Sequence, residues 1–220
     1  MNGLRLLGIM VGVLLAVAGC STTVNVATEQ GSGTSVTESR ATGSFEGLRV
    51  EAGIVADISI GAPLSVAVTA DDNLLDNVVT AVEGQRLDVR VEGSVSTKHP
   101  IKVAIVVPHL DAIEATSAAV IRVTGLECES LHLLAESSGR IVIDGHATEL
   151  DLRGNSAGQA ELGELAVGSA TVSLESAAQA RLNVADDISG SVTTAAVLRL
   201  VDQPSTVDVD TDAAGVVVTE

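Results

Sequence analysis

Aromatic side chains are nearly absent from this sequence, whose 220 residues include one Phe and neither Trp nor Tyr. Proteins that bind sugars or quaternary amines use aromatic faces to hold these ligands. Phe45, the one aromatic residue, lies close to the N-terminal segment and cannot form such a platform alone. The scarcity of aromatic residues therefore favours a protein partner over a glycan.

Basic residues are also scarce, with 12 Lys and Arg against 29 Asp and Glu, which gives a net charge of −17 at pH 7. Nucleic-acid-binding proteins need a basic surface that neutralises phosphates. The acidic balance therefore excludes nucleic acid as a partner. The same charge repels acidic polysaccharides, which weakens the case for an enzyme that cleaves them.

The sequence has two cysteines, Cys20 and Cys128. Cys20 is expected to carry lipid, which leaves no pair for an intramolecular disulfide. Cys128 lies between Glu127 and Glu129. Neighbouring carboxylates raise the pKa of a thiol rather than activate it, so we interpret Cys128 as a structural residue.

Residues 1–19 resemble the signal peptide of a bacterial lipoprotein. Arg5 precedes an apolar run over residues 6–18, and Val17-Ala18-Gly19-Cys20 resembles the lipobox that is cleaved before a lipidated cysteine. The run is shorter than the ~20 residues of a spanning helix, which weakens the alternative of a transmembrane anchor. We expect an exported protein that two acyl chains on Cys20 hold at a membrane. If the source is a diderm bacterium, Ser21 resembles a sorting signal for the outer membrane, and we then expect the protein at the outer membrane or cell surface.

The remaining chain divides into a tether and one domain. Residues 20–44 are rich in Ser, Thr, Gly and Glu, which predicts the lipidated Cys20 followed by a disordered tether. Residues 45–220 have the alternating apolar pattern of β-strands, clearest at 55–60, 64–68, 87–91 and 101–107. Asn73–Val82 alone has apolar residues at three-to-four spacing, which predicts a short helix.

A short phrase recurs six times in the second half of the chain, at intervals of 18 to 20 residues. Each copy has small residues followed by alternating apolar residues, and the copies begin at Ser117, Ser137, Ser156, Ser176, Thr194 and Asp212. A nearly constant period of this length predicts a solenoid, in which each repeat buries its apolar face by stacking on its neighbours. The small residues fit the corners, where stacked coils approach closely.

Alternation within each phrase assigns the side chains to an inward or an outward face. The predicted inward pairs are Ile121/Val123, Ile141/Ile143, Ala160/Leu162, Ala180/Leu182, Leu198/Leu200 and Val216/Val218. A second inward column, four residues before each corner, begins at Ile113 and reaches Gly190 and Asp208 in the later coils. On the outward face, Glu161 over Arg181 predicts a stacked ion pair.

These patterns predict an all-β, single-domain parallel β-helix with coils of about 18–20 residues. Connections between parallel strands of one sheet are almost always right-handed, so we expect a right-handed helix.

The lipobox, the segment Ala70-Asp71-Asp72-Asn73-Leu74-Leu75-Asp76 and the small-residue corners together resemble the putative auto-transporter adhesin, head GIN domain family of bacterial envelope proteins. The resemblance extends from about Phe45 to Val218 and implies a β-helix with no established catalytic motif. Corners in this family commonly read Gly-Ser-Gly, whereas most corners here read Ser-Ala-Ala. The difference suggests that these corners do not all need a left-handed backbone.

The sequence predicts no catalytic residues. Its four histidines lack the spacing of metal ligands, and no serine lies in a Gly-x-Ser-x-Gly motif. His132 and Asp151 lie at equivalent positions of adjacent coils, which predicts a stacked surface pair. Convergence of Arg122, Arg140 and Arg153 on carboxylates in a groove would instead indicate a polysaccharide-cleaving enzyme.

Asp208, Asp210 and Asp212 are weak candidates for a calcium site, because they alternate along one predicted strand. Calcium takes six to eight oxygen ligands, and no known calcium-binding motif is present. We favour the alternative that these charges discourage end-to-end pairing of an open strand edge. No metal or other cofactor is predicted.

The sequence thus predicts a non-enzymatic, lipid-anchored envelope protein whose β-helix contacts other proteins, in adhesion or envelope assembly. The alternative hypothesis is a polysaccharide-binding or polysaccharide-cleaving β-helix protein that depends on calcium. The expected partners are the membrane through Cys20, an unidentified protein, and a second copy through the apolar C-terminal coil.

Overall fold

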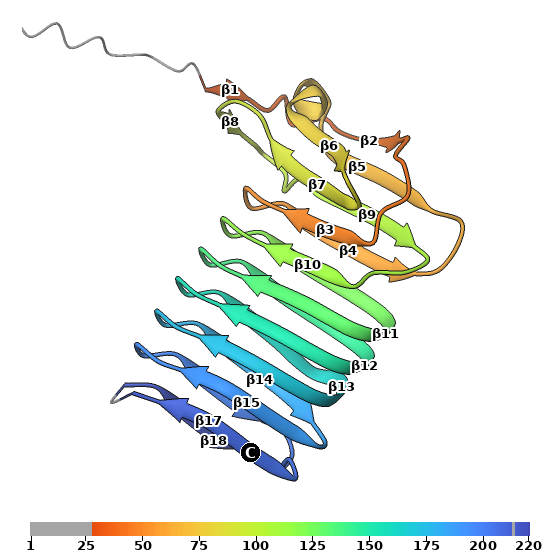
Figure 1. The fold of residues 1–220 in the computed structure, drawn as a ribbon. Coiled ribbons are helices and arrows are strands. Elements are labelled where there is room, and N and C mark those ends of the chain that lie inside the picture. The colour runs from red at the N-terminus through yellow and green to blue at the C-terminus, as the bar shows by residue number, and fades with distance from the viewer. Residues whose placement is uncertain (1–27, 213) are drawn as a thin grey trace, which may run out of the picture.

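Stacked strands run the whole length of the molecule and form a rod (Figure 1). The computed structural model describes residues 28–212 and 214–220, so the predicted signal peptide and Cys20 lie outside the described residues. The domain is a nearly all-β solenoid of about five turns, which confirms the predicted fold class. Its elements are β1 (Glu29–Gln30), β2 (Ser35–Arg40), β3 (Gly47–Val50), β4 (Val55–Ile60), β5 (Ser65–Asp71), η1 (Asp72–Asn77), β6 (Val78–Glu83), β7 (Arg86–Val91), β8 (Val95–Ser96), β9 (Lys102–Val107), β10 (Ala112–Ala115), β11 (Val120–Ala135), β12 (Arg140–Gly154), β13 (Gln159–Leu174), β14 (Gln179–Val184), β15 (Asp187–Val192), β16 (Val197–Leu200), β17 (Thr206–Thr211) and β18 (Val216–Thr219).

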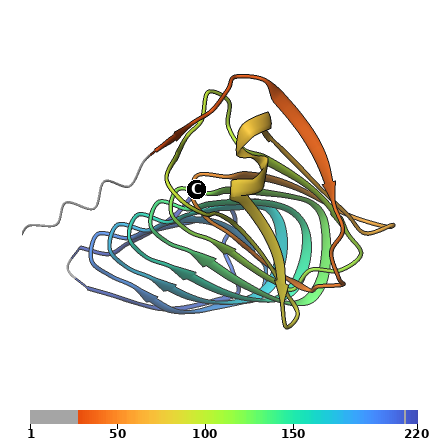
Figure 2. The same ribbon diagram turned by 90° about the horizontal axis from the view of Figure 1, so that it is seen from above.

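Each coil contributes to two walls of the rod. The strands β11, β12 and β13 are long enough to bend and belong to both walls: the first part of β11 pairs with β4 and its second part with β10. The first wall runs β2-β5-β9-β4-β11-β12-β13-β14-β16-β18. The second wall runs β6-β7-β3-β10-β11-β12-β13-β15-β17. Seen from above, the coils lie behind one another within a flattened outline (Figure 2).

Turns with a left-handed backbone join the second wall back to the first. In the turn Thr116–Ala119, Ser117 and Ala118 have φ of 51° and 62°, and the Ala119 N–H donates to the Thr116 carbonyl at 3.0 Å. Positive φ at both central residues is the geometry of a type I′ turn. Non-glycine residues reach it at a cost of roughly 1–2 kcal/mol each.

The suggestion that the Ser-Ala-Ala corners avoid this backbone is therefore wrong. The central residues of the later corners are also left-handed: Ser137/Ser138, Ser156/Ala157, Ser176/Ala177 and Thr194/Ala195. The reason lies in the stacking, because the corners form hydrogen bonds along the rod. The Ala118 N–H donates to the Ser137 carbonyl at 2.9 Å, and the Ser138 N–H to the Ser156 carbonyl at 3.0 Å. These hydrogen bonds between coils offset the local cost of the left-handed residues.

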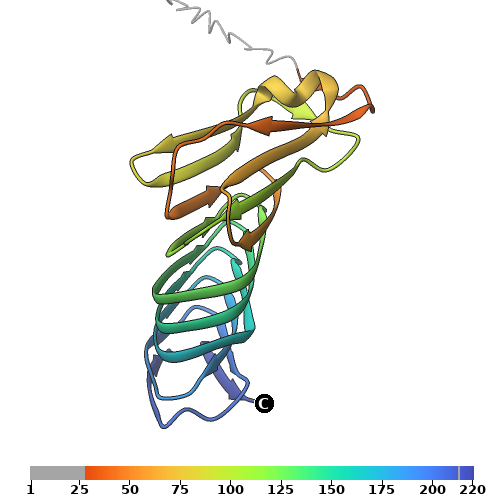
Figure 3. The same ribbon diagram turned by 90° about the vertical axis from the view of Figure 1, so that its right-hand side faces the viewer.

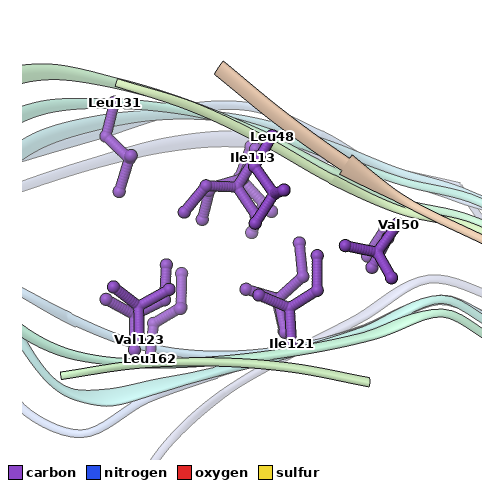
Figure 4. Packing of buried hydrophobic residues seen from close by; sticks show 14 of the residues in the cluster. Leu48, Val50, Ile113, Ile121, Val123, Leu131 and Leu162 are labelled. Atoms are coloured by element: carbon purple, nitrogen blue, oxygen red, sulfur yellow. The ribbon is translucent and has the colours of Figure 1, made fainter. Parts of the chain in front are cut away.

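The core lies between the two walls and follows the predicted columns through the inner coils. Ile121 and Val123 on the first wall face Leu48 and Ile113 on the second, and all four are buried (Figure 4). The equivalent residues of the next coils are buried as well: Ile141, Ile143, Ala160, Leu162, Ala180, Leu182, Leu198 and Leu200. The predicted inward pairs are thus confirmed from Ile121 to Leu200.

In the last coil the predicted inward pair is wrong by one residue. Val217, not Val216, lies in register with the buried Leu198, and Val218 lies beside the outward Arg199. On the other wall Val209, not Asp208, lies in register with Gly190. Thr211 lies in register with Val192, so Asp212 takes the place of Thr193, whereas the sequence pattern aligned it with Thr194. The last corner is therefore shifted by one residue. A shift of one residue exchanges the two faces of a strand.

Antiparallel strands close the other end of the rod, the capped end. There β2 and β9 pair antiparallel with β5, and β6 pairs antiparallel with β7. The prediction of a disordered tether up to residue 44 is therefore wrong for β2. Its side chains are mostly exposed, so the strand depends on backbone pairing with β5 and has little of the apolar pattern that reveals a strand.

The predicted helix at Asn73–Val82 is correct only in its first part. A 3-10 helix covers Asp72–Asn77, and β6 begins at Val78. Val78 and Val79 are β-branched and favour a strand, and β6 forms a hairpin with β7 across Gly84, whose φ is +65°. Figure 3 shows this helix above the strands that close the capped end.

Candidate functional site

The outward face of the second wall carries a shallow groove made of two hollows, of about 280 and 380 Å³. Both hollows are lined by His132 and Asp151. Glu114 and Arg153 line the smaller hollow, and Glu149 and Asp187 are among the residues that line the larger one. We call this feature the lateral groove.

The geometry of the lateral groove confirms the predicted His132–Asp151 pair. The two residues lie in register on β11 and β12, and Nδ1 of His132 is 3.7 Å from Oδ2 of Asp151. This distance allows an ion pair when the histidine is protonated but is too long for a hydrogen bond. A catalytic dyad would need a hydrogen bond that orients the imidazole toward a nucleophile.

The three arginines that would indicate a polysaccharide-cleaving enzyme do not converge on the groove. On the first wall, Arg122 contacts Asp57 at 3.2 Å and Arg140 contacts Glu161 at 3.9 Å. Arg153 lies on the second wall and contacts Asp151 at 3.4 Å. The lateral groove thus holds one of the three, in an exposed ion pair.

The last coil, which consists of β17 and β18 with the turn between them, exposes apolar side chains. Val207 is 49% exposed, Val216 45% and Val218 39%. Val207 lies in register with Ile188, which is buried in the preceding coil. Val207 thus retains about half of its accessible surface, because no other coil among the described residues covers it.

The structure separates the three candidate calcium ligands. Asp208 and Asp210 lie on the outward face of β17, in register with Ser189 and Ser191. Asp212 lies in the following turn, where its carboxylate accepts hydrogen bonds from the N–H groups of Thr194, Ala214 and Gly215 at 3.0, 3.1 and 2.9 Å. Within residues 28–212 and 214–220, no group of three or more His, Cys, Asp or Glu residues is placed to hold a metal ion.

Hydrogen bonding lowers the pKa of two carboxyl groups in this region. The pKa of Asp212 is lowered by the backbone N–H groups of Thr194, Ala214 and Gly215. The pKa of Glu220 is lowered mainly by its hydrogen bonds from Arg181, the shortest of which is 2.7 Å. Glu161 and Arg181 lie in register as predicted, but the guanidinium contacts Glu220 instead of forming the predicted ion pair.

Cys128 is free and half-buried, which fits its interpretation as a structural residue. Burial raises the pKa of its thiol, and the charges of Asp111 and Glu127 raise it further. A thiol with a raised pKa forms little thiolate at neutral pH, so Cys128 is not an activated nucleophile.

A polar cluster at the capped end was not predicted. The Asp71 carboxylate is fully buried and accepts hydrogen bonds from Nδ1 of His99 at 3.0 Å and from the Lys98 N–H at 3.1 Å. The hydrogen bond with His99 is the main cause that lowers the pKa of Asp71. The run Asp71-Asp72-Asn73 was the available sequence signal, because Asp and Asn commonly bind the backbone of turns.

This cluster holds residues 28–34, which we call the N-terminal strap. Within the strap, β1 pairs with β8, and the Ser32 N–H donates to Oδ1 of Asn73 at 2.8 Å. Nζ of Lys98 donates to the Ser32 carbonyl at 3.1 Å. Gly31 lies so close to Asp71 that a Cβ there would meet the carboxylate.

Comparisons with known proteins identify the fold and the family. The family model described as "Putative auto-transporter adhesin, head GIN domain" matches residues 44–204. The match ends before β17, so the last coil lies outside it. A comparison with curated proteins finds no match. No helix among the described residues is long and apolar enough to cross a membrane.

Solved structures of three putative adhesins are similar to the chain. That from Bacteroides fragilis has a TM-score of 0.70 and 14% identity, over 87% of this chain and 99% of that one. That from Parabacteroides merdae has a TM-score of 0.59 and 15% identity, over 87% and 98%. That from Parabacteroides distasonis has a TM-score of 0.51 and 19% identity, over 88% and 100%. At these identities the likeness supports the fold alone.

Proposed function

The chain belongs to the putative auto-transporter adhesin, head GIN domain family, and from that premise we propose that it is a non-enzymatic, lipid-anchored rod that contacts other proteins through its last coil. An adhesin-like family fits a role at the cell surface or in the envelope. Within that role, the rod serves adhesion or envelope assembly.

The distribution of exposed apolar side chains carries this proposal. Among the described residues, four large hydrophobic side chains are exposed: Val36, Val207, Val216 and Val218. Three of them lie on the last coil, and Val36 lies on β2 at the capped end. Exposed large apolar side chains that are concentrated in one region of a protein indicate a contact site more strongly than single scattered ones do.

The position of the last coil supports the same function. The first described strand, β1, lies at the capped end, and the last coil lies at the opposite end of the rod (Figures 1 and 3). With the chain anchored at Cys20, eight residues before Thr28, the capped end faces the membrane and the last coil faces away from it. A rigid β-solenoid keeps this separation, because each coil is fixed to its neighbours.

Photo-cross-linking in cells that produce the full chain tests this function. A photoreactive amino acid is placed at Val216 or Val218, and control variants carry it at Thr148 or Ser173, exposed positions on the second wall. We expect reproducible adducts with one protein from the last coil and few from the second wall. Equal adducts from both regions, or none from the last coil, would contradict the proposal.

The anchor is tested separately with Cys20→Ala. We expect the parent protein to sediment with membranes and the variant to leave them. The mass of the mature parent protein should include an acylated Cys20. A parent protein that reaches the same fraction as the variant would exclude the lipid anchor without affecting the proposed role of the last coil.

A further inference from the structure

Two strands of the last coil have backbone groups free on one side. In the described residues β17 pairs with β15 alone and β18 with β16 alone. Each therefore presents a row of N–H and C=O groups that another strand can pair with. Adding an extended segment to such an edge is a common mode of peptide recognition.

The two faces of β17 differ sharply in character. Asp208 and Asp210 point outward, and no Lys, Arg or His among the described residues lies within ion-pair distance of either. Val207 and Val209 face the interior, where Val207 is half exposed. A strand that pairs with this edge therefore meets carboxylates on one face and apolar groups on the other.

The edge of β18 carries no charge along Val216–Thr219. Val216 and Val218 face outward, and Val217 faces the interior. Of the two edges, β17 is thus the one whose side chains select a partner by charge.

The charge pattern argues against a second copy of the chain as the occupant. An end-to-end pair of copies would bring Asp208 and Asp210 of each β17 against the same residues of the other. Like charges directly opposite one another destabilise strand pairs. Both copies also carry the net charge of −17, which adds a long-range repulsion.

We propose that the β17 edge binds an extended segment of a partner protein in which basic residues alternate with apolar ones. The basic residues pair with Asp208 and Asp210, and the apolar residues cover Val207 and Val209. Because strand side chains alternate with a period of two, such a segment places its basic groups and its apolar groups on the two faces that β17 presents. The inference rests on the proposed function and adds the chemistry of the partner.

A synthetic peptide of eight residues, with Lys and Val alternating and a fluorophore at one end, tests the proposal directly. Fluorescence anisotropy with the folded chain should show saturable binding. A peptide with Glu in place of Lys should not bind. A peptide of the same composition with its Lys residues grouped at one end should bind at least about tenfold more weakly, because its charges and apolar groups cannot alternate.

Variants of the chain assign the binding to β17. D208N/D210N should weaken binding of the alternating peptide by about tenfold. E127Q/E129Q is a matched control, since it removes the same charge at the same spacing from two exposed positions on β11, a segment that pairs with β12 and lies far from the last coil. Equal losses in the two variants would reduce the effect to net charge and overturn the proposal.

N-methylation of alternate residues separates strand addition from simple charge attraction. One edge of the peptide pairs with β17, so methylation in one of the two frames should abolish binding while the other frame retains it. Retained binding in both frames would overturn the proposal. So would a concentration-dependent dimer of the chain in sedimentation experiments, because it would identify a second copy as the occupant.

The cross-linking and peptide experiments fail in different ways. Adducts at Val216 or Val218 without peptide binding would leave the proposed function intact and reject the basic and apolar partner. Peptide binding without adducts in cells would support the proposed ligand preference of the β17 edge. It would reject the proposed function, in which the last coil contacts a protein in cells.

Discussion

The stack of strands terminates differently at the two ends of the rod. A solenoid has an exposed rung at each end, because each coil covers its neighbour. At the capped end, β2, β5, β6 and η1 turn the parallel stack into antiparallel hairpins and a helix. At the last coil, β17 and β18 keep the parallel geometry and expose three valines. The difference supports the proposal that the last coil is the end that contacts a partner.

Charged side chains follow the same division. At the capped end the half-exposed Arg86 contacts the nearly buried Asp88 at 2.8 Å and Glu114 at 3.5 Å, which links β7 to β10. The hydrogen bond with Asp88 is the main cause that raises the pKa of Arg86. In the last coil, Asp208 and Asp210 face solvent on an unpaired edge. The Arg86 cluster of the capped end thus forms ion pairs within the protein, whereas Asp208 and Asp210 of the last coil are exposed to solvent.

The largest expected difference concerns the core. Ile141 is fully buried in an inner coil, and Ile141→Ala should lower the free energy of unfolding by about 3 kcal/mol. Val217 occupies the same inward column in the last coil but is only partly buried. Val217→Ala should therefore lower the free energy of unfolding by less than about 1 kcal/mol. Urea unfolding followed by far-ultraviolet circular dichroism measures both. Equal losses would show that the last coil is as well packed as the interior.

The next effect compares ion pairs at the two ends. Asp88→Ala leaves Arg86 without its closest carboxylate, and we expect a loss of about 2 kcal/mol in the free energy of unfolding. Glu220→Ala removes an exposed partner of Arg181 and should leave the midpoint of the urea transition nearly unchanged. A larger loss of stability in Glu220→Ala than in Asp88→Ala would contradict the expectation that the ion pairs of the capped end contribute more to stability.

The N-terminal strap gives a local effect at the capped end. Asp71→Asn weakens the acceptor for the Lys98 N–H and for His99, which should loosen the strap. Hydrogen exchange followed by mass spectrometry should show protection in residues 28–34 falling by about an order of magnitude. Asp76→Asn is the control, because Asp76 is an exposed residue of η1, the helix that directly follows Asp71. Unchanged protection in Asp71→Asn would show that β1–β8 pairing alone holds the strap.

The smallest expected effect is a pH dependence of the last coil. The pKa of Asp212 is lowered in the folded chain, so the stability that it supplies is complete above the ordinary carboxyl range. This stability is lost as the pH falls through the lowered pKa. Amide resonances of Thr194 and Gly215 should therefore shift together on acidification, and the shift should vanish in Asp212→Asn. Independent shifts that persist in the variant would contradict this assignment.

The inner coils were predictable because their residues repeat. Ile121, Ala180 and Leu198 each precede a polar residue and another apolar one, and this alternation is sufficient to assign a buried face. His132 and Asp151 could be placed side by side for the same reason, since equal positions in successive coils lie in register. The family resemblance is confirmed by the match over residues 44–204.

Where one residue or one hydrogen bond decides the structure, the sequence pattern was insufficient. The last corner could begin at Asp212 or one residue later, and that choice exchanges the faces of Val216 and Val217. The left-handed corners depend on hydrogen bonds between coils, which no local preference of Ser or Ala reveals. The strand β2 depends on backbone pairing with β5, and the Asp71–His99 contact joins residues 28 positions apart.

Hydrogen exchange with and without the alternating Lys–Val peptide tests the contrast between the two ends most directly. We expect the peptide to slow exchange in β17, while β2 and β6, the outermost strands of the capped end, exchange as before. Slower exchange at the capped end, or equal slowing along the whole rod, would contradict the assignment of the last coil as the contact site.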